Sequence, residues 1–117
     1  MVTLAAGAVV LVPFPFSNLA QAKLRPAVVL ADAGRGDWIL CQVTSNPYTD
    51  PDAVELTPTS FAQGSLRITS YARPGKLFTA SQELIVSQAG TLKTVACQVV
   101  IELVIHILQT SLSVKIH

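Results

Sequence analysis

The chain has 117 residues, of which 50% are hydrophobic and only 13% are charged, and its formal net charge is +1. This length fits one domain, residues 1–117, and the apolar content excludes an intrinsically disordered chain. Cys41 and Cys97 stand in apolar surroundings without metal-ligand spacing, which excludes a disulfide scaffold and a zinc cluster. We therefore expect buried free thiols in a protein of a reducing, cytoplasmic compartment.

The first half of the chain predicts short strands separated by turn-forming segments. Residues 7–13 form an apolar run that ends at a proline, which is typical of a buried strand. A second strand opens at Pro26, and a third, "DWILCQVTS", follows the turn "GRGD", so these two strands form a hairpin. A proline-containing loop then leads to a fourth short strand, "VELTP".

The second half predicts two more strands and then two helices. The segment "SLRITSYARPGKLFT" alternates as a strand does, and we predict a strand, a bend at Pro74-Gly75 and a further short strand. Thr79, with Gln82 three residues later, resembles a capping box and predicts a short helix around "TASQELIVS". Strands followed by helices predict an α+β, mainly β, fold built on a small, strongly bent antiparallel sheet or barrel.

The last predicted helix spans about residues 94–109 and is apolar over most of its surface. Its polar residues Gln98, Glu102 and His106 are spaced by four and predict a single solvent-facing stripe. A helix this apolar must be packed on several sides, so we predict a homodimer in which a second subunit covers part of it. The apolar segment also looks too short to span a bilayer, and we expect no contact with a membrane.

The charges are unevenly distributed along the chain. No acid occurs in residues 1–31, and none occurs in residues 61–82. The cations of these two segments are Lys23, Arg25, Arg67, Arg73 and Lys76. If the two segments meet in space, they form a local basic surface that the net charge hides; otherwise the cations are separately solvated.

Arg25 and Thr44 are the main candidates for functional residues in the sequence. Arg25 begins the second strand, and Thr44 with Ser45 ends the third, so the predicted hairpin brings all three to one end of the sheet. A planar, permanently charged guanidinium beside hydroxyls is suited to binding phosphate. The alternative is that Arg25 pairs with a carboxylate and that the hydroxyls cap the turn at Asn46. No acid lies within six residues of Arg25 on either side.

The order of these motifs resembles the PemK/MazF family of toxins, the mRNA interferases of type II toxin–antitoxin systems. The likeness rests on the Arg-Pro dipeptide before an apolar strand, the strand end "CQVTSN", the basic segment "YARPGKLFTASQELI", the turn "AGTL" and the terminal helix. It implies an SH3-like barrel with a short helix and a C-terminal helix. It also implies a homodimeric endoribonuclease that cleaves single-stranded RNA without metal or cofactor, and an antitoxin that lies across the active groove.

Carried onto matching positions, the resemblance makes Arg25 and Thr44 the catalytic residues. Ser45 and Ser70 are then candidates for a proton relay or a phosphate contact. The RNA-binding candidates are Phe14, Phe16, Lys23, Arg67, Tyr71 and Arg73. The chain departs from the family at the strand matching "LRITSYAR", where many members have an acid and this chain has Thr69 and Ser70.

Two alternative functions stay open at this point. The missing acid motivates a catalytically weakened family member that binds RNA or an antitoxin. The apolar C-terminal helix motivates a toxin like those of the CcdB branch, which share the barrel and poison DNA gyrase. The Arg-Pro motif favours the nuclease branch.

Overall fold

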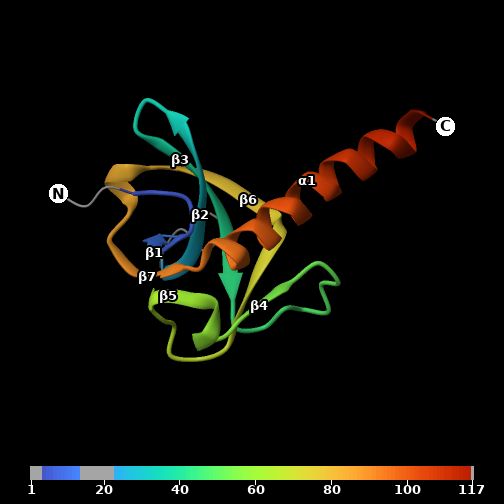
Figure 1. Cartoon of the computed structure of the whole chain (residues 1–117). Helices are drawn as coiled ribbons and strands as arrows, with labels where there is room; N and C mark the ends of the chain where they lie inside the picture. The colour runs from blue at the N-terminus through green and yellow to red at the C-terminus, as the bar shows by residue number, and fades with distance from the viewer. Residues whose placement is uncertain (1–3, 14–22, 117) are drawn as a thin grey trace.

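The computed structural model describes residues 4–13 and 23–116 (Figure 1). Within these residues, seven strands, two 3₁₀ turns and one α-helix follow one another. They are β1 (Ala8–Pro13), β2 (Leu24–Gly34), β3 (Asp37–Thr44), β4 (Val54–Leu56), η1 (Pro58–Ser60), β5 (Phe61–Gly64), β6 (Ser70–Ser81), η2 (Gln82–Leu84), β7 (Ser87–Leu92) and α1 (Thr94–Ile116). The mainly β fold with a C-terminal helix confirms the predicted fold class.

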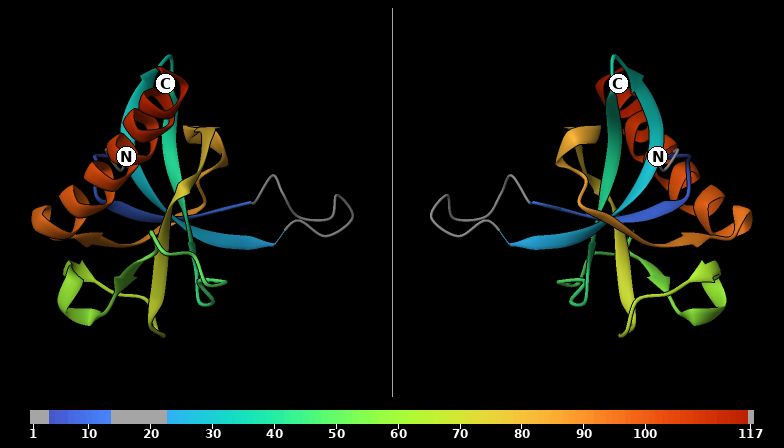
Figure 2. Two further views of the ribbon diagram at one scale, coloured as in Figure 1. Left: turned by 90° about the vertical axis from the view of Figure 1, so that its right-hand side faces the viewer. Right: turned by 90° about the vertical axis from the view of Figure 1, so that its left-hand side faces the viewer.

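All seven strands belong to one antiparallel sheet with the order β4-β6-β3-β2-β1-β7-β5. The sheet curls into a nearly closed barrel, and α1 lies along one side of it (Figure 2). Its two faces bury separate apolar clusters. One cluster contains Val28, Cys41 and Val43 and packs against α1, and the other contains Val10, Val29 and Leu40. The core is therefore made of small aliphatic side chains, as the composition predicts.

The β2–β3 hairpin forms as predicted, with a two-residue turn at Arg35-Gly36. Both turn residues have a positive φ, 57° and 82°, which matches the twist that hairpins favour. The second strand, however, begins at Leu24 and not at Pro26. Pro26 pairs with β1 only, because pairing with β3 starts at Ala27. Proline is tolerated inside β2 because no strand needs its missing N–H there.

The segment after the fourth strand differs from the prediction. Residues 65–69 are irregular, and β6 starts at Ser70 and runs unbroken through the expected bend at Pro74-Gly75. At the position of the expected bend, the register between β3 and β6 shifts. Cys41 pairs with Leu77, whereas Val43 pairs with Ala72. The strands β5 and β7 were missed from the sequence, since neither has the alternating β-branched pattern of the other strands.

The short helix is a single 3₁₀ turn at residues 82–84, and its predicted cap was wrong. Thr79 lies inside β6, and Ser81 caps the turn by accepting a hydrogen bond from the Glu83 backbone N–H at 3.3 Å. The backbone N–H of Gln82 donates to the Gly36 carbonyl, and that of Val86 donates to a β1 carbonyl. Pairing with neighbouring strands therefore outweighs the local helix signal.

Helix α1 is longer than predicted and is mostly exposed. Cys97 and Val100 are buried against the barrel, whereas Gln98, Glu102 and His106 face solvent as predicted. The C-terminal turns extend beyond the barrel (Figure 1). Large apolar side chains exposed on this helix are Val95, Val99, Ile105, Leu108 and Leu112.

By length and composition, α1 could cross a membrane, so the prediction that it is too short was wrong. The window Thr94–Leu112 has 19 residues and a mean hydropathy of 1.7, and 11% of it is buried. Glu102 lies inside this window, and an acid at the centre of a bilayer costs about 2.5–3.5 kcal/mol. The first turns of α1 are also part of the barrel core, which ties the helix to a globular fold.

Candidate active site

A surface pocket of about 420 Å³ opens where β2 enters the sheet and β3 leaves it. It brings together segments that are distant in the sequence: the start of β2, the end of β3 and the irregular segment 65–69. Its polar lining residues are Lys23, Arg25, Thr44, Ser45, Tyr48, Arg67 and Ser70. The two acid-free segments therefore meet here and form the local basic surface that their sequences predict.

Arg25 lies at the second position of β2 and is exposed to the pocket. The β2–β3 ladder ends at the pair Ala27 and Gln42, so Arg25 and Thr44 each lie two residues beyond its last pair, and both line the pocket. Among the described residues, no acid forms an ion pair with Arg25. The carboxylate pairing considered as an alternative is therefore not found in the described structure, and the guanidinium is available to a ligand.

Thr44 is only 9% exposed, and its hydroxyl has a defined orientation. Its Oγ1 accepts a hydrogen bond of 3.2 Å from the Asn46 backbone N–H. The turn-capping alternative is thus correct for this oxygen. Because the oxygen accepts from the turn, the hydroxyl proton is left to donate, and a threonine in this state can bind a phosphate oxygen. Ser45 beside it is exposed.

Ser70 is a buried hydroxyl at the wall of the pocket, with 4% exposure. It donates its proton to the Ile68 carbonyl at 3.0 Å, so its oxygen remains free to accept. The segment that this bond closes also carries Arg67, an exposed cation. Together with Lys23, Arg67 extends the positive charge of the pocket beyond Arg25.

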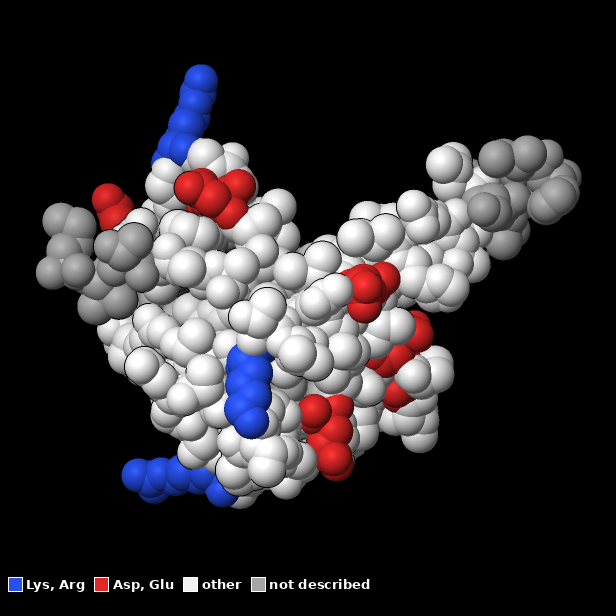
Figure 3. Space-filling model, in the orientation of Figure 1, with Lys and Arg blue, Asp and Glu red and all other residues white. Residues whose placement is uncertain are grey.

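The remaining cations do not make a continuous basic surface on the face seen in Figure 3. There, lysine and arginine side chains are separated from one another and interspersed with acids. No acid lines the pocket among the described residues. The positive character of the site is therefore local, as the net charge of +1 requires.

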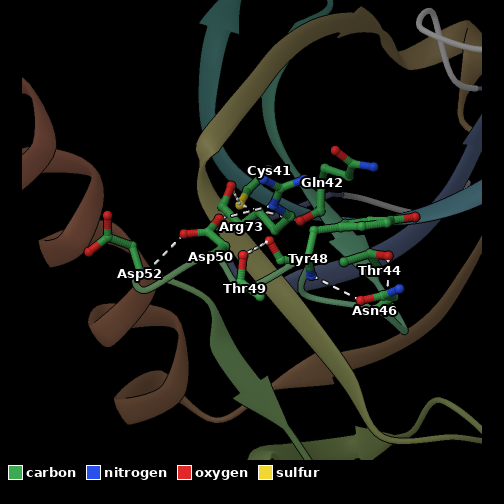
Figure 4. A network of polar contacts seen from close by, with 9 residues as sticks. All are labelled: Cys41, Gln42, Thr44, Asn46, Tyr48, Thr49, Asp50, Asp52 and Arg73. Atoms are coloured by element: carbon green, nitrogen blue, oxygen red, sulfur yellow. Dashed lines mark hydrogen bonds and ion pairs between the residues drawn. The ribbon is translucent and has the colours of Figure 1, made fainter.

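Arg73, predicted to contact RNA, is engaged with the protein itself. Its Nε donates to Asp50 Oδ2 at 2.9 Å, and its guanidinium lies 5.6 Å from the centre of the Tyr48 ring (Figure 4). The hydrogen bond from Arg73 holds the pKa of the Asp50 carboxyl below its usual range. Tyr71, the aromatic candidate on β6, is half-buried and does not line the pocket. Phe14 and Phe16 lie outside the described residues.

Sequence reasoning missed Tyr48, which lines the pocket and is 61% exposed. An available signal was its position four residues after Thr44, in the loop that the third strand feeds. Two apolar residues of segment 65–69, Leu66 and Ile68, were missed in the same way and lie on the pocket wall. The site is therefore a cationic, hydroxyl-lined pocket with an aromatic and two aliphatic side chains.

The thiols are not part of this site. Burial raises the pKa of Cys41 to about 12. Its Sγ donates a hydrogen bond to the Arg73 carbonyl at 3.1 Å. Burial also raises the pKa of Cys97. Both cysteines are free, as predicted, and a thiol of raised pKa is a poor nucleophile at neutral pH.

Comparison with solved structures shows which proteins share this fold. The MazF of Deinococcus radiodurans (Form-I) has a TM-score of 0.71 at 21% identity, over 93% of this chain and 99% of that one. A mycobacterial endoribonuclease in complex with its cognate antitoxin has a TM-score of 0.71 at 14% identity, over 92% and 96%. Mycobacterium tuberculosis toxin MazF-mt6 has a TM-score of 0.64 at 13% identity, over 83% and 91%.

The sequence itself carries the family assignment. No curated protein sequence matches the chain. The family model of the PemK-like, MazF-like toxins matches residues 5–108, which include every described strand and most of α1. The chain therefore belongs to the family of PemK-like, MazF-like toxins of type II toxin–antitoxin systems.

Proposed function

We propose that the chain is a metal-independent endoribonuclease that cleaves single-stranded RNA by attack of a ribose 2′-hydroxyl on the adjacent phosphorus. The observation that carries the proposal is that Arg25 and Thr44 line one pocket together with Lys23 and Arg67. The structural relatives include proteins described as endoribonucleases. The family membership and this constellation support the same chemistry.

The reaction forms a bond from the 2′-oxygen to phosphorus and breaks the bond from phosphorus to the 5′-oxygen. The proton of the 2′-hydroxyl leaves and a proton joins the 5′-oxygen, so the products are a 2′,3′-cyclic phosphate and a 5′-hydroxyl. Negative charge builds up on the phosphorane oxygens between these steps. Arg25 offers two parallel donors to those oxygens, and Thr44 offers its hydroxyl proton to one of them.

The other polar groups of the pocket have supporting roles in this proposal. Lys23 and Arg67 bind the phosphates on either side of the scissile one. Ser45 and Ser70 are the candidates for a phosphate contact or a proton relay, and Ser70 can take part as an acceptor while it donates to Ile68. Phe14 and Phe16 stay predicted contacts for RNA bases.

Two partners belong to the proposal. The first is a second copy of this chain, because the exposed apolar side chains of α1 form a surface that water disfavours. The second is a cognate antitoxin, because relatives were solved as MazE-MazF complexes. The two free thiols fit a cytoplasmic location.

Light scattering at tens of micromolar protein tests the homodimer, and a monomer at that concentration would contradict it.

The test of the activity is incubation of a long single-stranded RNA with the protein in EDTA. Arg25→Ala should slow cleavage about 10²–10³-fold, which is the effect of removing one such electrostatic donor. The matched control is Arg35→Ala, which removes the same charge at the exposed hairpin tip, outside the pocket. Arg35→Ala should cut RNA at the wild-type rate.

The outcomes separate the candidate functions. Equal rates for wild type and Arg25→Ala would disprove the assigned mechanism. Intact RNA in every reaction, with RNA retained in a low-salt gel shift, would favour the weakened RNA-binding alternative. The absence of an acid from the described pocket is the observation that keeps this alternative in view.

A further inference from the structure

The loop after β3 holds Tyr48 in a conformation that a bulky residue seldom adopts. Tyr48 and Thr49 have φ values of 54° and 59°, in the left-handed region. This region costs an L-residue free energy, so the loop must hold it in place. The Tyr48 N–H donates to Asn46 Oδ1 at 2.9 Å, and the Asp50 N–H donates to the Pro47 carbonyl at 2.9 Å. The backbone thus presents the Tyr48 side chain in one direction.

The ring of Tyr48 is also contacted by a side chain whose own position is fixed. The Arg73 guanidinium lies over it at 5.6 Å from the ring centre, and Arg73 is fixed by Asp50 at 2.9 Å. Asp50 is fixed in turn, because its Oδ1 accepts from the Asp52 N–H at 2.9 Å. The Arg73 and Asp50 side chains are only 18% and 13% exposed. Figure 4 shows this chain of contacts running from Asp52 through Asp50 and Arg73 to Tyr48.

A ring that is held this firmly is nevertheless 61% exposed and lines the pocket beside Thr44. An aromatic side chain stabilises a fold chiefly through the area that it buries, and most of this ring is not buried. Arg73 contacts the ring, and the rest of the ring faces the pocket and the solvent. The arrangement leaves a flat, positioned aromatic surface next to the groups that would bind the scissile phosphate.

We infer that Tyr48 is the surface on which an RNA base stacks, and that Arg73 and Asp50 are positioning residues for its ring. This inference rests on the proposed function, because it takes single-stranded RNA as the ligand. Single strands are bound by cations that follow the phosphates and by aromatic rings that stack on the bases. The pocket supplies both, with Arg25, Lys23 and Arg67 for the phosphates and Tyr48 for a base.

Stacking on Tyr48 makes a prediction that phosphate binding does not. Loss of the ring should weaken binding about ten- to a hundredfold for RNA that carries bases. It should leave binding of a bare sugar-phosphate backbone unchanged. Loss of the Arg25 charge should weaken binding of both ligands, since both carry phosphates.

The experiment uses two probes that the protein cannot cleave. One is a mixed-sequence 2′-O-methyl RNA dodecamer, and the other is an abasic dodecamer with the same number of phosphates. Fluorescence anisotropy at low salt gives the dissociation constants for wild type, Tyr48→Ala, Tyr48→Phe and Arg25→Ala. Tyr48→Ala should lose affinity for the first probe only, and Tyr48→Phe, which keeps the ring, should bind like wild type.

Asp50→Asn tests the positioning role by the same comparison. Releasing Arg73 lets the Tyr48 ring move, so this variant should lose part of the affinity for the base-carrying probe and none for the abasic one. A merely structural defect would weaken binding of both probes together. Thermal melts followed by circular dichroism check that each variant is folded at the assay temperature.

The failure of this inference is distinguishable from failure of the proposed function. If Tyr48→Ala binds the base-carrying probe with wild-type affinity, the stacking role is overturned. The exposed ring would then serve as a contact for a protein partner. Equal losses on both probes would overturn it too, because the ring would then act on the backbone. Unchanged binding of both probes by Arg25→Ala would instead refute the RNA pocket itself.

Discussion

Gly64→Ala probes how closely the edge strand β5 must approach β7. Gly64 has a φ of 65°, and a Cβ added to it would lie 2.3 Å from the Ala89 carbonyl oxygen and 2.8 Å from the Gly90 Cα. Both obstacles are backbone atoms, since Gly64 and Gly90 are partners in the β5–β7 ladder. β5 cannot simply swing away, because Phe61 at its other end is buried in the core.

The expected loss combines two terms. A left-handed φ costs a residue with a Cβ about 1–2 kcal/mol, and forcing the strands apart costs about 1–3 kcal/mol more. We therefore expect Gly64→Ala to lower the free energy of unfolding by about 2–5 kcal/mol. Urea denaturation followed by the fluorescence of the single tryptophan, Trp38, measures this quantity.

Gly75→Ala is the matched control for this substitution. An added Cβ at Gly75 meets nothing within 4 Å, and its φ lies outside the left-handed region. The same chemical change should therefore be neutral or should stabilise the protein by up to about 1 kcal/mol. A Gly64→Ala protein that unfolds within about 0.5 kcal/mol of wild type would refute the reasoning, because β5 would then be shown to detach at no cost.

Three further changes test the ion pair, a thiol and the helix contact. Arg73 lowers the pKa of Asp50, so the ionised pair stabilises the fold at neutral pH and this contribution is lost as the pH falls through the lowered pKa. Asp50→Asn should thus cost about 1 kcal/mol at pH 7, and urea melts should show the difference from wild type shrinking as the pH falls below the ordinary pKa of an aspartate. With its pKa raised to about 12, Cys41 should resist iodoacetamide at pH 8 in the folded protein and react in urea, as mass spectrometry would show. Val100→Ala, at a fully buried position of α1, should cost about 2 kcal/mol in the same melts, whereas Val99→Ala, at an exposed one, should cost less than about 0.5.

Strands with a strong apolar pattern were predictable, and strands formed by pairing were not. The runs of β1, β2 and β3 are rich in valine and leucine and are bounded by turn residues, so their local signals match their structure. The strand β7, "SQAGTL", has no such pattern and forms because β1 and β5 offer their edges on either side. The same pairing reduces the predicted helix near Gln82 to one 3₁₀ turn.

The site was predictable where it follows from hairpin geometry. Arg25 and Thr44 line the same pocket because the β2–β3 hairpin, whose turn can be recognised in the sequence, brings the start of β2 and the end of β3 to one end of the sheet. The two bulges that set the final register of this ladder could not be predicted from the sequence. Tyr48 was not predictable, because its exposure depends on a left-handed loop. Nor was the role of Arg73, because its partner Asp50 is 23 residues away and the loop between β3 and β4 has to fold back to reach it.

The Arg73–Asp50 pair also bears on the missing acid, which many family members have in the strand matching "LRITSYAR" and which could serve as a general base. Asp50 is linked to the pocket residue Tyr48 through Arg73, but Asp50 is bound to Arg73, its pKa is lowered, and it does not line the pocket. A carboxylate in that state is a weak base and is not placed to take a proton from RNA. In the pocket as described, the polar groups are cations and hydroxyls, so the catalytic effect we assign to it is electrostatic.

That electrostatic assignment ranks the pocket residues by what they can contribute. A hydroxyl near its ordinary acidity is a poor general base at neutral pH, so Thr44 and Ser70 act best as hydrogen-bonding groups. In the proposed reaction Arg25 would donate two parallel hydrogen bonds to the oxygens on which charge develops. Because no described group of the pocket is a good general base, we expect slow cleavage, whereas binding would depend on Arg25 and on the base that we infer to stack on Tyr48. The nuclease and the RNA-binding alternatives thus use the same site, and the cleavage and binding assays distinguish them.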